Sequence, residues 1–279
     1  MRPSLLSRLG RLLMYVAVIA IFVGPFWGIV ITAFSGLILK PGQLLLLPVE
    51  PTLENFRAAL INMEVWRYLL NSMIVALTGT FLQAGVSALA AYALARKKFR
   101  GAAVVSLLIL STMMLPEEII SIPLYLVVQA RLPLIDASIY NTYAAMVLPV
   151  VGWAFSIFML TEFMRAIPKE LEEAARIDGA NEWQIFSRVV LPLVRPALGS
   201  VLIFGFIMIW DQYLLPLIVV NDKHLFTVPV ILGALRVDET ITPNIFVAAT
   251  LIAMAPPIIV YLLLQKQFNR GIMAGAVKG

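Results

Sequence analysis

Long stretches without a charged side chain constrain this chain more than any other feature. No Asp, Glu, Lys or Arg occurs between Arg11 and Lys40 or between Arg67 and Arg96. Each stretch exceeds the roughly 20 apolar residues that an α-helix needs to cross the hydrocarbon core of a bilayer. Only 13% of the residues are charged, about half of the ~25% that is usual in soluble domains. The sequence therefore predicts a membrane protein.

Further apolar runs bring the number of expected spans to six and predict an all-α fold. One run contains Glu117 and Glu118, and another contains Asp211. The first run is too long for a signal peptide, so we interpret it as a retained helix. The prediction is a cytoplasmic N-terminus at 1–11, a transmembrane domain at 12–265 and a cytoplasmic tail at 266–279. The expected transmembrane helices cover residues 12–35, 69–95, 103–128, 140–161, 197–220 and 244–265.

The distribution of Lys and Arg predicts the orientation. With six spans both termini lie on one side, and that side carries 15 of the 21 basic residues, against 6 on the other. Basic residues concentrate in cytoplasmic loops, so both termini are expected in the cytoplasm. The net charge of +5 is then a consequence of topology, and no nucleic-acid partner is needed to explain it.

The cytoplasmic connection at residues 163–195 is long enough to contain helices of its own. A first helix is expected to end at Asp178-Gly179, because glycine accepts the left-handed conformation beyond a helix end. Asn181 with Gln184 three residues later predicts a capping box that begins a second helix. The sequence thus predicts a cytoplasmic helix-turn-helix. Physical reasoning alone leaves open whether it docks another protein or only links two spans.

The same connection resembles the EAA motif of ABC-importer permeases. Glu173-Ala174-Ala175 is followed after three residues by Gly179, and the aliphatic Val189 stands just before Val190 and Leu191-Pro192. The resemblance implies a coupling loop that sits in a cleft of an ATPase subunit. The residues that it assigns to ATPase coupling are Glu173, Ala174, Ala175, Asp178, Gly179, Ala180, Leu191 and Pro192.

Shorter matches along the chain resemble the carbohydrate-uptake permeases of the maltose-transporter type. They include Asn71-Ser72, the stretch from Ala91 to Arg96, and Trp210-Asp211-Gln212-Tyr213, where Asp211 replaces a more usual Asn. The C-terminal sequence resembles a tail that reaches toward the ATPase. The resemblance assigns a contact with the ATPase to three residues of this tail, Gly275, Lys278 and Gly279.

The resemblance implies an ATP-driven, binding-protein-dependent importer in the cytoplasmic (inner) membrane. The expected partners are an ATPase subunit dimer, a second permease subunit in a heterodimer, an extracytoplasmic solute-binding protein and the lipid bilayer. ATP and Mg²⁺ would bind to the ATPase, so this chain is expected to be no enzyme. The implied solute is a sugar or oligosaccharide, with glycerol 3-phosphate as the alternative.

Polar residues inside spans are the candidates for a translocation pathway, because ionisable groups in lipid are costly and usually face a pathway or a partner. The candidates are Asp211, Gln212, Glu117 and Gln83. Pro116 is expected to kink the third span, which can place Glu117 on the pathway or near the external surface. Glu118 points about 100° away from Glu117. Carboxylates would repel an anion, which favours a neutral sugar.

Several chemistries are excluded by the residues that the sequence lacks. It has no cysteine and a single histidine, His224, so disulfides, a metal site and a catalytic triad are not expected. It has no glycine-rich phosphate loop, so no bound cofactor is expected. An intramembrane hydrolase would lack its nucleophile and base. A passive channel or an assembly factor would explain the spans, but it would not explain the residue spacing of the cytoplasmic loop.

Overall fold

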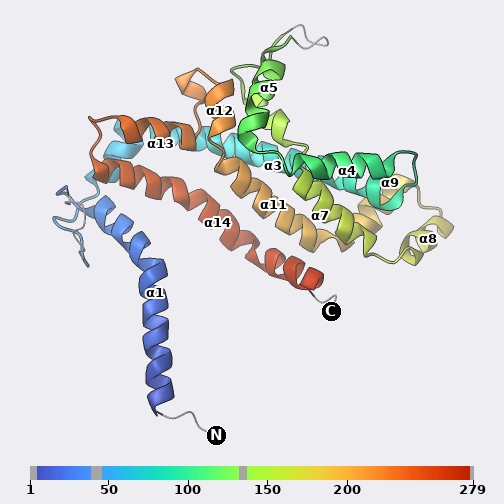
Figure 1. Ribbon diagram of the computed structural model, residues 1–279, viewed down its shortest axis with the longest axis horizontal. Coiled ribbons are helices and arrows are strands. Elements are labelled where there is room, and N and C mark those ends of the chain that lie inside the picture. The colour runs from blue at the N-terminus through green and yellow to red at the C-terminus, as the bar shows by residue number, and fades with distance from the viewer. Residues whose placement is uncertain (1–4, 39–45, 132–136, 277–279) are drawn as a thin grey trace. The chain divides into compact units, whose positions relative to one another are not determined.

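The regular structure of the described residues is helical, which confirms the expected all-α class. The structure is a computed structural model that describes residues 5–38, 46–131 and 137–276. Apart from helices, its described part contains one isolated bridge, between Ser35 and Pro51. Figure 1 shows the course of the chain. The chain divides into two compact units, Met1–Arg67 with Ile231–Ala255, and Tyr68–Val230 with Pro256–Gly279.

The first unit is built around the end of its N-terminal helix. Asn55 donates hydrogen bonds from Nδ2 to the carbonyls of Ala33 (2.9 Å) and Ser35 (2.8 Å). Asn244 donates from Nδ2 to the carbonyls of Ser35 (2.7 Å) and Leu37 (2.9 Å). Two amides from distant parts of the sequence therefore fix the turn that leaves this helix. The elements are α1 (Leu5–Phe34), α2 (Glu54–Arg57), the π-helical turn η1 (Ala58–Asn62), the start of α3 (Val65–Arg96), most of α13 (Val228–Val237) and the first part of α14 (Pro243–Ala276).

The second unit contains the remaining helices, with the long helix α3 as its backbone. α3 has 32 residues, and α7 and α11 pack against each other within the same unit. The other elements are α4 (Ala102–Thr112), α5 (Glu117–Gln129), α6 (Tyr143–Val147), η2 (Leu148–Val150), α7 (Ala154–Arg165), α8 (Glu170–Ile177), α9 (Glu182–Gln184), the π-helical turn η3 (Ile185–Val190), α10 (Leu191–Leu193), α11 (Arg195–Trp210), α12 (Leu214–Val219) and η4 (Lys223–Leu225).

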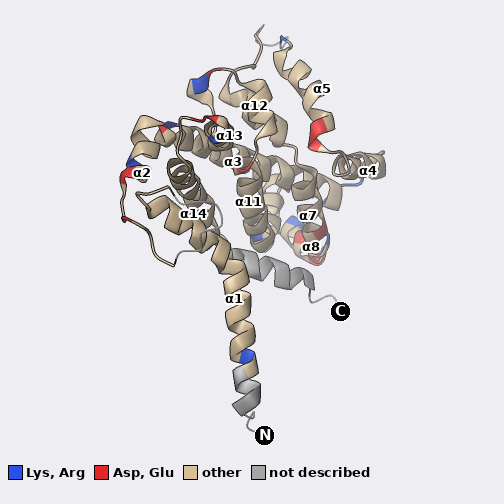
Figure 2. Cartoon of the chain, turned by 60° about the vertical axis from the view of Figure 1, so that its left-hand side comes forward, with Lys and Arg blue, Asp and Glu red and all other residues tan. Residues whose placement is uncertain are grey.

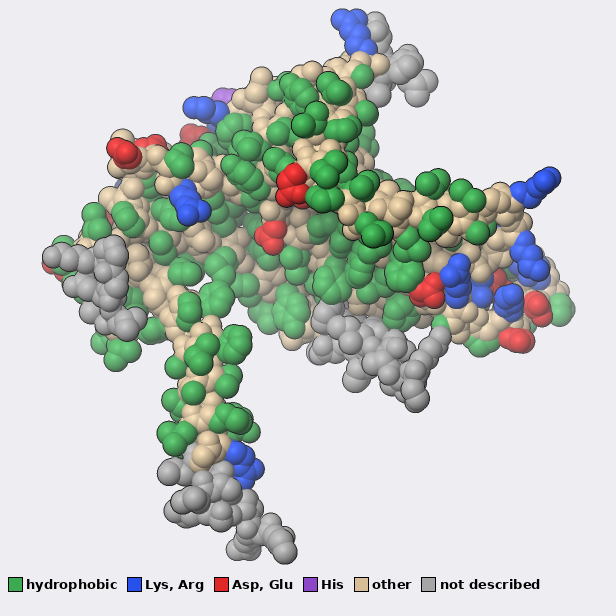
Figure 3. Space-filling model, in the orientation of Figure 1, with side chains coloured by type: hydrophobic (Ala, Val, Ile, Leu, Met, Phe, Trp, Pro, Cys, Tyr) green, Lys and Arg blue, Asp and Glu red, His purple; other side chains and the backbone are tan. Residues whose placement is uncertain are grey.

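The described residues contain three uninterrupted apolar helices that are long enough to cross a bilayer. These are Gly10–Phe34 within α1, α3 itself, and Pro243–Gln265 within α14. Hydrophobic side chains stay exposed along α1 (Figure 3), as expected for a helix in lipid. Three further pairs of helices are bent by 108°, 40° and 78°, so six spans result if each bent pair crosses once. The third of these pairs joins residues 182–193 to α11.

The expected third span is broken where Pro116 predicts a kink. α4 ends at Thr112, α5 begins at Glu117, and the two helices are bent by 108°. Pro116 is the N-cap of α5, a position where a missing backbone N–H costs little. Glu117 and Glu118 occupy the first turn of α5, where the helix dipole favours carboxylates. The sequence predicts the position of the break, but not its angle.

Glycine allows α3 and α11 to pack closely. A Cβ at Gly205 of α11 would lie 3.0 Å from Oε1 of Gln83 in α3. A Cβ at Gly79 of α3 would lie 2.9 Å from Cδ1 of Ile209 in α11. Small residues at helix contacts are typical of membrane proteins, where van der Waals packing drives association.

Replacing Gly205 with leucine should lower the thermal stability of the purified chain in detergent. The added side chain would push α11 away from Gln83, and overpacking of this kind costs about 1–3 kcal/mol. Gly85→Leu is the matched control, because Gly85 lies in α3, the helix that packs against Gly205, and no atom beyond its own stretch of helix lies within 4 Å of its added Cβ. The midpoint of thermal unfolding measures both variants. Equal midpoints would contradict the tight packing of α3 and α11.

Candidate functional site

The helix-turn-helix forms where the sequence predicts it. α8 ends at Ile177, and Gly179 has a φ of +83°, the left-handed conformation that favours glycine. The capping box is present, because the Asn181 N–H donates to Gln184 Oε1 at 2.8 Å and the Gln184 N–H donates to Asn181 Oδ1 at 2.9 Å. Both helix boundaries are confirmed, because local chemistry determines them.

One face of this loop is exposed and partly apolar. The side chain of Ile177 is 87% exposed and that of Trp183 is 65% exposed. Glu173, Ala174 and Asp178 are exposed beside them. Figure 2 shows charged positions gathered around α8 and the neighbouring end of α7. Large apolar side chains next to charges are typical of a surface that another protein covers.

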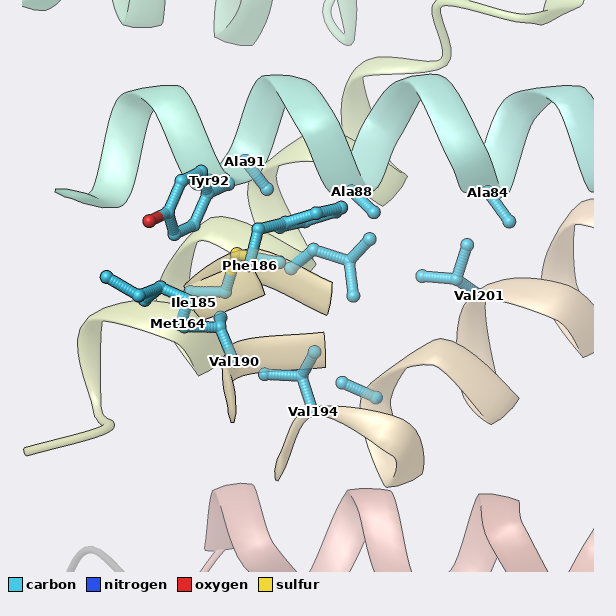
Figure 4. Close-up of a cluster of buried hydrophobic side chains, with 12 residues drawn as sticks. Ala84, Ala88, Ala91, Tyr92, Met164, Ile185, Phe186, Val190, Val194 and Val201 are labelled. Atoms are coloured by element: carbon cyan, nitrogen blue, oxygen red, sulfur yellow. The ribbon is translucent and has the colours of Figure 1, made fainter. Parts of the chain in front are cut away.

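The opposite face of the loop is part of the core of its own unit. Ile185, Phe186 and Val190 of η3 are buried against α3, α7 and α11 (Figure 4). The rings of Phe186 and Tyr92 lie 5.2 Å apart. The half-buried residues Ala175, Ala180 and Leu191 pack against this cluster, and Pro192 is half-buried beside Leu191. The loop is therefore more than a surface hairpin, because half of it belongs to the helix packing.

Ion pairs attach the loop to the last turn of α3, a feature that the sequence analysis missed. Arg96 Nε lies 2.6 Å from Glu172 Oε1, and Lys97 Nζ lies 2.5 Å from Glu182 Oε2. In the sequence, Arg96 and Lys97 both count among the basic residues that predict the orientation, and Arg96 also ends a stretch that resembles carbohydrate-uptake permeases. Charged residues at the end of one span, together with acids in the loop at 163–195, were the available signal.

The bonds to Glu182 determine its titration. Its hydrogen bond with Lys97, followed by that from the Tyr92 hydroxyl, lowers the pKa of Glu182 from 4.5 to about 2. Because this folded-state pKa lies below the ordinary one, the contact stabilises the loop above about pH 4.5. The stabilisation is lost as the pH falls toward 2. Glu182 is therefore charged throughout the physiological range.

A second candidate site is a cavity of about 940 Å³ within the second unit. Three of the four predicted pathway residues line it, namely Glu117, Asp211 and Gln212. Nε2 of Gln212 donates a long hydrogen bond of 3.4 Å to Glu117 Oε1. Glu118 is absent from the lining, as the expected divergence of consecutive side chains implies. No Lys, Arg or His is found among the described residues that line the cavity.

Apolar and aromatic side chains form the rest of the cavity wall. Trp153 and Phe155 lie at the start of α7, and Tyr213 follows α11. The break between α4 and α5 contributes Met113 and Leu115. Broken helices at this depth are tolerated where they line a cavity. Two carboxylates in a largely apolar wall can bind hydroxyl or ammonium groups as hydrogen-bond acceptors.

The fourth predicted pathway residue, Gln83, lies elsewhere. Its side chain is fully buried, and Nε2 donates to Ser156 Oγ at 2.9 Å. It is not part of the cavity lining. The structure thus separates Gln83 from the other three residues and gives it an interhelical hydrogen bond.

Asn71 and Ser72 hold the segment that follows α12. Nδ2 of Asn71 donates to the carbonyls of His224 (2.8 Å) and Phe226 (2.9 Å). The N–H of Val228 donates to Ser72 Oγ at 2.8 Å. The Tyr143 hydroxyl also donates to Oδ1 of Asn71, at 2.7 Å. These contacts give a structural role to the Asn71-Ser72 match.

The predicted tail contact falls largely outside the described part of the chain. Gly275 lies near the end of α14. Lys278 and Gly279 are outside the described residues.

The structure is that of a membrane protein, because its apolar helices reach bilayer length and one face of its loop is buried against them. The family model of the binding-protein-dependent transport system inner membrane component matches residues 83–274. Since this match covers more than half of the sequence, the chain belongs to that family. It is an inner-membrane component, and the relatives described next are transport permeases rather than enzymes.

Comparison with known proteins agrees with this assignment. The chain is 30% identical to the arabinooligosaccharides transport system permease protein AraQ of Halalkalibacterium halodurans, over 95% of this chain and 94% of the relative. It is 34% identical to the sn-glycerol-3-phosphate transport system permease protein UgpE of Shigella flexneri, over 82% of each chain. A solved bacterial ABC transporter for alginate import superposes with a TM-score of 0.79 at 23% identity, over 96% of this chain and 99% of the other. That structure supports the fold.

Proposed function

We propose that this chain is one of two permease subunits in an ATP-driven importer for a neutral sugar or oligosaccharide. Its partners are a separate ATPase dimer, a second permease and an extracytoplasmic solute-binding protein. ATP and Mg²⁺ bind to the ATPase, and both termini of this chain face the cytoplasm. The observation that carries the proposal is the loop at 163–195, which exposes Ile177 and Trp183 while its other face is buried in the core.

The exposed face of the loop is the dock for the ATPase. Glu173 and Asp178 supply charges at its edge, and Ala174 and Gly179 leave room for the backbone of a partner. Ala175, Ala180, Leu191 and Pro192 support the dock from beneath, since they are half-buried. The tail residues Gly275, Lys278 and Gly279 add a further contact with the ATPase, which the sequence resemblance alone supports.

The residues that line the cavity form this chain's part of the wall of the translocation pathway. Asp211, Glu117 and Gln212 offer acceptors and one amide donor to the hydroxyl groups of a sugar. The aromatic residues Trp153 and Tyr213 offer flat apolar faces. Sites for small molecules typically combine an apolar wall with a few polar groups in this way.

The charge of the cavity distinguishes the two candidate solutes. Two carboxylates and no cation among its described lining residues would repel a phosphate, because like charges interact strongly where water is scarce. This favours a neutral saccharide, in line with the relative named for arabinooligosaccharides. Glycerol 3-phosphate, named for the other relative, is the second candidate.

The proposal is tested by isolating the tagged chain from its native membrane in mild detergent. We expect an ATPase, a second permease and a solute-binding protein to copurify, as identified by mass spectrometry. The complex is then reconstituted in vesicles with ATP, and import of labelled neutral oligosaccharides and of glycerol 3-phosphate is compared. Import of glycerol 3-phosphate alone would support the second candidate. Repeated isolation of the intact chain without an ATPase would favour a passive channel or an assembly factor.

A further inference from the structure

The coupling loop is attached to α3 through a buried ion pair. The side chains of Arg96 and Glu172 are only 4% and 6% exposed, and Nε lies 2.6 Å from Oε1. Arg96 also donates from Nη2 to the carbonyl of Ile167, at 2.8 Å. One guanidinium thus holds both the chain that enters α8 and the first turn of α8 itself.

A buried ion pair needs an explanation other than stability. The cost of removing both charges from water offsets most of their attraction, and apolar residues of similar volume are often as stable. What a buried pair supplies is a fixed geometry between two elements. Here the elements are the end of α3 and α8.

Glu182 attaches the second helix of the loop to the same turn of α3. Its carboxylate accepts hydrogen bonds from the Tyr92 hydroxyl (2.9 Å) and from Arg176 Nη2 (3.1 Å), and Lys97 Nζ lies 2.5 Å away. Tyr92 lies in the last turns of α3 and Lys97 directly follows that helix, whereas Arg176 belongs to α8. Both helices of the loop are therefore bonded to α3 and to each other.

α3 continues without a break from this attachment to the other end of the second unit. There, Asn71 and Ser72 of α3 hold residues 224–228, in the segment between α12 and α13. Leu214 and Leu215 of α12 line the cavity. α4 and α5, by contrast, are separated by the 108° bend. A long helix is a stiff element that can carry a displacement between two sites.

We propose that Arg96 and Glu172, supported by Glu182, are positioning residues that make α3 move with the coupling loop. Force on the exposed face of α8 reaches α3 because Glu172 lies on the buried face of that helix. α3 then displaces the segment after α12 and the adjoining wall of the cavity. This inference rests on the proposed importer function. It adds to that function the residues that connect the dock to the pathway.

The test measures how many ATP molecules the reconstituted complex hydrolyses for each solute imported. The probe is the neutral oligosaccharide that the wild-type complex imports best. Arg96→Glu places two carboxylates at the attachment and should raise this ratio about tenfold, within the usual range of coupling between sites. Adding Glu172→Arg restores an ion pair and should bring the ratio back to within about threefold of the wild type. The difference that remains reflects the lost hydrogen bond from Arg96 to the carbonyl of Ile167.

A second variant keeps the test valid if Arg96→Glu does not fold. Glu182 is half-exposed, so Glu182→Gln should fold and still raise the ratio. The matched control is Arg57→Ala, which removes an ion pair of 3.7 Å with Glu54 that lies wholly within α2, outside the loop and the cavity. The ratio of this control should equal that of the wild type.

The outcomes separate this inference from the function on which it rests. Suppose the wild-type complex imports solute, and Glu182→Gln and a folded Arg96→Glu hydrolyse the same number of ATP molecules per imported solute as the wild type. Then the contacts between α3 and the loop do not transmit its movement to α3. If the reversed pair assembles but leaves the ratio as high as Arg96→Glu alone does, the ion pair is not the connecting element. If the wild-type complex shows no ATP-driven import, the proposed function is wrong and the inference falls with it.

Discussion

Replacing Gly179 with aspartate should abolish solute uptake and leave the chain folded in the membrane. Gly179 is exposed at the bend of the coupling loop, and apart from its two chain neighbours no atom lies within 4 Å of an added Cβ. The added side chain therefore clashes with no other part of this chain, and aspartate is among the residues that tolerate a positive φ. It places a second carboxylate beside Asp178 on the surface that we propose as the ATPase dock. Uptake of the neutral oligosaccharide should fall more than about tenfold, the effect of a loss of ~1.4 kcal/mol or more.

Two matched variants separate docking from backbone strain. Asparagine has the shape of aspartate and tolerates a positive φ, so Gly179→Asn should fold normally and impair uptake through bulk alone. Gly179→Ala adds the strain of a positive φ with little bulk and should impair uptake least. Copurification of the ATPase is measured with each variant. Unchanged uptake by Gly179→Asp would show that the bend is not covered by a partner.

The features that sequence predicted well are those that depend on neighbouring residues. The end of α8 at Asp178-Gly179 and the capping box of Asn181 with Gln184 are set by contacts over a few residues. The break at Pro116 likewise follows from the chemistry of one residue. Charge-free runs similarly predict apolar helices, because the requirement of the bilayer is local.

The features that sequence missed join residues that are far apart in the chain. Arg96 ends α3 whereas Glu172 lies in the later loop at 163–195, and the hydrogen bond from Asn71 to His224 bridges 153 positions. Gln83 shows the same limit, because its polar side chain in a span fits a pathway as well as an interhelical bond. Only its position against Ser156 and Gly205 decides between them.

Replacing Asp211 with alanine should reduce uptake more than it reduces assembly of the complex. Asp211 follows α11, lines the cavity and is exposed in this chain, so its removal leaves no buried partner unsatisfied. A hydrogen bond to a charged group contributes about 1.5–3 kcal/mol, which corresponds to a ten- to hundredfold loss of rate, roughly. Asp211→Asn keeps an acceptor and should lose less.

Glu118→Gln is the matched control for Asp211, because Glu118 is an acid of the same region that does not line the cavity. It should import the neutral oligosaccharide at the rate of the wild type.

The charge of the cavity also predicts how Asp211 variants respond to an anionic solute. Asp211→Asn should admit glycerol 3-phosphate more readily than the wild type, because one of the two repelling carboxylates is gone. Loss of the assembled complex in Asp211→Ala, with no change in the rate per complex, would instead make Asp211 a structural residue. That result would contradict the proposal that the cavity lines the translocation pathway.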